Sequence, residues 1–125
     1  MTDDELEARF EEAKTTAQRH HAEATLAMYE VELLSGVVDK LKEIRPKETD
    51  EFYTFLMFAW FDAFTRATDA AQAAYARGEA KVREFLASYE VCKQEGAGVG
   101  VELPEVDYSG KVPDIVSLTV TDFEM

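Results

Sequence analysis

The sequence predicts an all-α fold, a long antiparallel coiled-coil-like hairpin of two helices followed by an extended arm. Three observations predict it. Apolar residues recur at alternating steps of four and three along the first 44 residues, and a similar seam follows residue 50. Only a short polar stretch with a proline separates the two seams. Most of the glycines and prolines come after residue 95. We therefore expect a helical hairpin over residues 1–95 and an extended arm over residues 96–125.

The first helix is expected over residues 3–44, which contain no proline and only one glycine, Gly36. Its seam is apolar at all but one position, a pattern typical of a helix packed along its length on another helix. Thr2 or Asp3 can cap its start. The seam consists of Leu6, Phe10, Ala13, Ala17, His20, Ala24, Ala27, Val31, Leu34, Val38 and Leu41.

A short connection over residues 45–50 separates the two helices. Pro46 disfavours helical geometry at Arg45 and so ends the first helix. Thr49 or Asp50 can cap the helix that follows. Because the connection is short and polar, the helices are expected to lie side by side and antiparallel.

The second helix is expected over residues 50–94, with Gly96 just beyond its end. Folding the hairpin about Lys47 sets bulky seam residues opposite one another at both ends and alanines opposite alanines in the middle. We therefore expect an Ala-rich middle in which the helices approach closely. The facing pairs expected are Leu41 with Tyr53, Leu34 with Trp60, Ala27 with Ala67, Phe10 with Phe85 and Leu6 with Tyr89.

Residues 96–125 are expected to form the extended arm, because their glycines and prolines exclude a continuing helix. Two stretches alternate between apolar and other residues, as short strands do. We expect one or two short strands that bind other protein subunits, and a disordered acidic tail is the alternative. The two stretches are Val99, Val101 and Leu103, and Val116, Leu118 and Val120.

The apolar surface of this hairpin is expected to exceed what two helices can bury together. Aromatic residues lie all round the start of the second helix, and a helix that is apolar all round is buried all round. Aromatic residues are also enriched in protein interfaces, so a homo-oligomer is expected. The expected interface residues are Phe52, Phe55, Phe58, Trp60, Phe61, Leu33 and Val37, with Val116, Leu118 and Val120 from the arm.

The net charge of −13 disfavours direct binding to nucleic acid or to an anionic membrane surface. The longest apolar run, residues 52–64, is too short to span a bilayer. The acidic first residues lack the apolar core of a secretory signal, so the cytoplasm or a virus particle is the expected location. The single cysteine, Cys92, excludes an intramolecular disulfide and is expected to be a buried apolar residue.

Candidates for a metal site lie on the first helix. A di-metal bundle site uses Glu-x-x-His, whereas here the order is reversed. Folding about Lys47 also leaves no acidic residue of the second helix level with His20. The preferred interpretation of His20 is a polar seam residue that sets the helix register. The metal candidates are His20, His21, Glu23 and Glu30, and no catalytic residue or cofactor is expected.

The function that these features favour is that of a non-enzymatic structural or assembly protein. It would self-associate, or dock into a virus particle or secretion-type complex, through the aromatic loop end and the arm. One alternative is an acidic inhibitor or chaperone-like binder of a basic, nucleic-acid-binding protein, acting through residues 3–12. A second alternative is a metal-binding helical-bundle enzyme that uses the four metal candidates.

Overall fold

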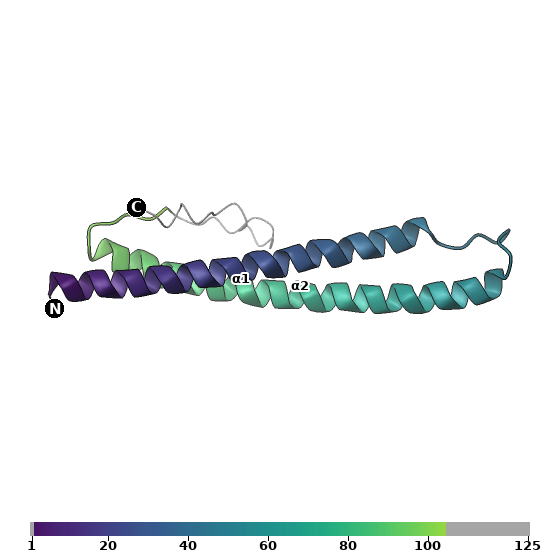
Figure 1. Cartoon of the computed structure of the whole chain (residues 1–125), viewed down its shortest axis with the longest axis horizontal. Helices are drawn as coiled ribbons and strands as arrows, with labels where there is room; N and C mark the ends of the chain where they lie inside the picture. Colours follow the sequence, from purple (N-terminus) through teal and green to yellow (C-terminus); the bar gives the residue numbers. More distant parts are fainter. Residues whose placement is uncertain (1, 105–125) are drawn as a thin grey trace.

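A computed structural model describes residues 2–104, which fold into two long helices packed against each other (Figure 1). Helix α1 comprises Asp3–Glu43, and helix α2 comprises Tyr53–Ala97. The two helices lie side by side and run in opposite directions. The all-α class and the helical hairpin are therefore confirmed, and the described residues contain no strand.

The start of α1 agrees with the prediction. Thr2 is the N-cap, and its hydroxyl accepts a hydrogen bond from the Glu5 backbone N–H at 3.3 Å. Asp3, Asp4 and Glu5 occupy the first turn, where negative charge stabilises the positive end of the helix dipole. The side chain at the cap thus satisfies one of the amide groups that a helix start leaves without an intrahelical acceptor.

The start of α2 differs from the prediction that Thr49 or Asp50 caps it. The N-cap is Phe52, which has a φ of 59° and makes no side-chain capping bond. The Asp50 carboxylate instead accepts the backbone N–H of Lys47 at 2.8 Å. Asp50 also donates its own N–H to the Lys47 carbonyl at 2.8 Å. The residue expected to cap the helix therefore closes a turn within the connection.

The register of the two helices differs from the register predicted by folding the hairpin about Lys47. The indole N–H of Trp60 donates to the carbonyl of Leu41 at 2.7 Å, so Trp60 is level with Leu41 and not with Leu34. Figure 1 shows that the connection runs on past the end of α1, so that α2 begins beyond it. The predicted facing pairs were therefore wrong, because the chain does not turn back at Lys47.

The predicted seams do lie between the helices, since every residue of the first seam is buried or half-buried, as are the α2 residues predicted to face it. Full burial is concentrated in the half of the hairpin that is distant from the connection. There, small residues of α1 pack in one cluster with bulky residues of α2, instead of alanines opposite alanines. The cluster comprises Phe10, Ala17, Ala24, Met28, Val82, Phe85, Tyr89, Cys92 and Leu103.

Beyond α2 the chain turns back along the hairpin (Figure 1). Gly100 has a φ of 79°, and the Val101 N–H donates to the Gly96 carbonyl at 2.8 Å. The Tyr89 hydroxyl donates to the carbonyl of Pro104. Leu103 is buried in the core cluster, and Val99 packs against it.

No strand forms at residues 99–103 in the described part of the chain, where Val99, Val101 and Leu103 contact the core of their own hairpin instead. The second stretch, Val116 to Val120, lies outside the described residues. Gly96 was expected beyond the second helix, but it is buried within its last turn.

Replacing Gly96 by alanine tests this close packing. An added Cβ would lie 2.9 Å from Phe10 Cε2 and 3.1 Å from the Val101 carbonyl oxygen. We expect Gly96→Ala to lower the free energy of unfolding by about 1–3 kcal/mol, measured by urea denaturation.

Gly36→Ala is the matched control, since Gly36 also lies within a helix, α1, and the added Cβ would have no atom within 4 Å apart from the nearby backbone of that helix. Alanine is the better helix former, so we expect this variant to gain about 0.5–1 kcal/mol. A Gly96→Ala variant as stable as Gly36→Ala would show that the helix end does not pack as described.

Candidate functional site

Large apolar side chains remain exposed in the half of the hairpin next to the connection. Phe55 and Phe58 are 75% and 72% exposed, and Phe52 and Phe61 are 68% and 63% exposed. The first turns of α2 have no helix beside them, because α2 begins beyond the end of α1 (Figure 1). We define the loop-end apolar surface as the exposed side chains of Leu26, Leu33, Val37, Ile44, Phe52, Phe55, Leu56, Phe58 and Phe61.

Part of this surface forms a regular stripe on each helix. Phe55, Phe58 and Phe61 recur every third residue, which places them on one side of α2. On α1, exposed apolar residues recur at steps of seven, four and seven, which is the spacing of a coiled-coil seam. The α1 stripe consists of Leu26, Leu33 and Val37, with Ile44 at the C-cap of the helix. Both stripes are separate from the seams that hold the hairpin together.

Most of the expected interface residues on the helices belong to this surface, whereas Trp60 does not. Its indole is half-buried between the helices and stacks on Phe64 with ring centroids 4.9 Å apart. The Arg45 guanidinium lies 5.5 Å from the centroid of the same indole. Trp60 therefore stabilises the hairpin itself. The expected interface residues Val116, Leu118 and Val120 lie outside the described residues.

Charge is distributed unevenly along the hairpin. Residues 40–51 carry four basic and four acidic side chains, which cancel. Residues 2–14 carry six acidic side chains and only two basic ones, Arg9 and Lys14. Arg9 is paired with Glu95 at 2.8 Å. The loop end is therefore nearly neutral, and repulsion between copies of the chain would be weakest there.

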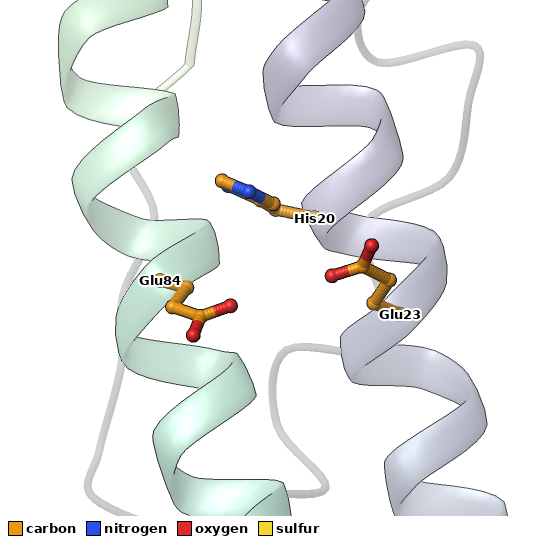
Figure 2. A group of neighbouring side chains, drawn as sticks. All are labelled: His20, Glu23 and Glu84. Atoms are coloured by element: carbon orange, nitrogen blue, oxygen red, sulfur yellow. The ribbon is translucent and has the colours of Figure 1, made fainter.

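A second candidate site lies where α1 and α2 pack together farther from the connection (Figure 2). His20 and Glu23 are one turn apart on α1, and Glu84 extends toward them from α2. One ligand atom from each of these three side chains lies within 4.8 Å of the others. We call His20, Glu23 and Glu84 the His–Glu cluster.

Two further side chains contact the His–Glu cluster. The Lys81 amino group lies 3.4 Å from a Glu23 carboxylate oxygen and 3.5 Å from one of Glu84. The negative charge of Glu84, followed by the hydrogen bond and charge of Glu23, raises the pKa of Lys81. His20 Nδ1 is hydrogen-bonded to the hydroxyl of Ser88. The carboxylates of the cluster therefore already attract a cation that belongs to the chain.

The structure separates the four metal candidates found in the sequence. It brings His20 and Glu23 together. His21 is buried, with its ring edge-on to Phe85 at a centroid distance of 5.0 Å. Glu30 pairs with Arg77 instead. Glu84 was not among the predicted residues, because a fold about Lys47 sets His20 opposite Ala74, whereas Ser88 is the partner of His20 in the structure.

Comparison with family models, with curated proteins and with solved structures found no match to this chain. Within residues 2–104, neither helix has an apolar stretch long enough to cross a membrane.

The thiol of Cys92 is fully buried in the core cluster, which confirms the expectation from the sequence. Burial raises the pKa of this thiol, because the thiolate would lose its hydration. The reactive form of a cysteine is the thiolate, so the folded protein should protect Cys92 from modification.

We predict that a thiol reagent at pH 8 modifies Cys92 far more slowly in the native protein than in urea. The rate should rise in parallel with the unfolded fraction measured by circular dichroism. Modification that is equally fast with and without urea would show that the thiol is accessible in the folded chain.

Proposed function

We propose that this chain is a non-enzymatic assembly protein whose hairpins self-associate through the loop-end apolar surface. The observation that carries the proposal is the exposure of Phe52, Phe55, Phe58 and Phe61, each at 63–75%. Isolated exposed apolar residues are ordinary, but a large contiguous apolar surface marks an interface.

The exposed area suffices for a specific interface. A fully buried aromatic side chain covers about 150–250 Å², so these four phenylalanines offer roughly 500 Å² between them. The remaining members of the surface add further apolar area, and each partner in an interface of standard size contributes about 800 Å². The apolar surface of one hairpin therefore supports a stable contact.

A second copy of the same chain is the partner that fits this surface best. The stripe of Leu26, Leu33, Val37 and Ile44 has coiled-coil spacing, so it suits a helix as its neighbour. Residues 40–51 carry no net charge, so this part of the surface adds no repulsion between two copies of a chain whose net charge is −13. Two hairpins joined by their loop halves would form a four-helix bundle.

A charge placed on either stripe tests the proposal. The native mass of the wild-type protein, measured by light scattering, should correspond to two or more chains. Leu33→Glu and Phe58→Glu should each shift it to the mass of one chain, because a desolvated carboxylate is costly in an apolar interface. Circular dichroism should stay unchanged, since both residues are exposed in the single hairpin.

Ser35→Glu and Gln72→Glu are the matched controls. Both residues are exposed, and neither belongs to the loop-end apolar surface. Each control adds the same charge to the same helix as the variant that it accompanies. The controls should keep the native mass of the wild type. A wild-type protein with the mass of one chain, or loss of assembly in the controls as well, would contradict the proposal.

A further inference from the structure

We propose that the His–Glu cluster is a binding site for a divalent transition-metal ion, with zinc as the best fit, that joins α1 to α2. This inference is independent of self-association, because the cluster lies outside the loop-end apolar surface. It depends on the distances among His20, Glu23 and Glu84, on the hydrogen bonds of Ser88, and on the position of Lys81.

The positions of the three side chains suit a metal ion. Zinc binds histidine nitrogen and carboxylate oxygen at about 2.0–2.2 Å, which sets ligand atoms around a tetrahedral ion roughly 3.4 Å apart. The cluster holds its ligand atoms within 4.8 Å of one another. Rotation about the side-chain bonds of two glutamates closes that difference, so the helices need not move.

Packing of the helices holds the ligands at these positions. Phe85 follows Glu84 in the sequence and is fully buried, and Ala24 follows Glu23 and is 1% exposed. The backbone on both sides of the site is therefore fixed by the hairpin core. Figure 2 shows that the three side chains extend from the two helices toward the same region.

The hydrogen bonds of Ser88 decide which nitrogen of His20 can bind a metal. The Ser88 hydroxyl donates its single proton to the Glu84 carbonyl at 2.8 Å. With its proton so placed, the hydroxyl accepts from His20 Nδ1, which assigns the proton of the neutral ring to Nδ1. Nε2 then carries the lone pair that a metal requires. A ligating histidine is commonly oriented by a hydrogen bond from its other ring nitrogen in this way.

The ligand set selects the class of ion. One imidazole nitrogen and two carboxylate oxygens leave a fourth position for water, as in zinc sites with three protein ligands. Calcium takes six to eight oxygen ligands, and magnesium requires octahedral oxygen geometry, so neither suits this set.

Lys81 occupies the place of the cation in the structure described here. Its ammonium group lies between the two carboxylates, so a metal ion must displace it. Lysine is a flexible side chain, and this one is 42% exposed, so the ammonium can move into water. Removing the ammonium should therefore strengthen metal binding, whereas loss of a ligand should weaken it.

The test is calorimetric titration of the full, untagged chain with zinc chloride. We expect one saturable site per chain, and a rise in the midpoint of thermal unfolding with zinc concentration, because the ion binds only the folded hairpin. His20→Gln and Glu84→Gln should each weaken zinc binding by about tenfold or more. Lys81→Met should tighten it several-fold.

Glu90→Gln is the matched control, since Glu90 is an exposed acid of α2 outside the cluster. It should bind zinc as the wild type does, and magnesium should not compete with zinc. Glu84 is exposed, so Glu84→Gln keeps the test valid even if His20→Gln perturbs the fold. Absence of saturable binding would overturn the site. Equal weakening of zinc binding by Glu90→Gln and Glu84→Gln would also overturn the site, because it would indicate that zinc adsorbs to surface carboxylates.

Discussion

Packing between Phe10 of α1 and Gly96 of α2 sets how far the two helices are displaced along each other. The Phe10 ring lies where a side chain at residue 96 would be, so this level of the hairpin accepts only glycine without a shift. Around it, Ala17 and Ala24 pack in the same cluster as Phe85. With this end fixed, α2 runs past α1 at the other end, where its first aromatic turns remain exposed (Figure 1).

The two candidate sites follow from the same displacement. It leaves the start of α2 without a neighbouring helix, so the phenylalanines there have no partner helix within the chain. It also brings Glu84 to the level of Glu23 and His20, where a fold about Lys47 would have placed no carboxylate. The hairpin is thus divided into a half with a buried core and a half with exposed apolar stripes. The acidic side chains of residues 2–14 lie at the end away from these stripes.

The helices and their seams could be predicted from the sequence, because each seam repeats within its own helix. The register could not, because a pattern that repeats every seven residues matches its partner equally well after a shift by a whole repeat. Trp60 contacts Leu41 instead of Leu34, and His20 contacts Ser88 instead of lying opposite Ala74. Such shifts leave the same residues inside but change every pair across the interface.

The two candidate sites could be predicted from the sequence to different extents. Exposed aromatic residues such as Phe55 and Phe58 were predicted from the sequence, because they lie all round the start of the second helix, where one neighbouring helix cannot cover them. Two of the three members of the His–Glu cluster were found, since His20 and Glu23 are neighbours on one helix. Glu84 was missed because its place depends on the register. The left-handed conformation of Phe52, which sets where α2 begins, has no signal in the sequence.

The displacement of the helices can be measured directly by the distance between two spin labels. In a Cys92→Ala background, one label at Arg19 is combined with a second at Ala87 or at Ala76, all of which are exposed. Dilution with unlabelled chain removes distances between copies. The structure predicts a shorter distance for Arg19 with Ala87, because Ala76 lies about 17 Å farther along α2 at 1.5 Å per residue. A shorter distance for Arg19 with Ala76 would mean that the hairpin folds about Lys47, and would contradict the register on which both candidate sites depend.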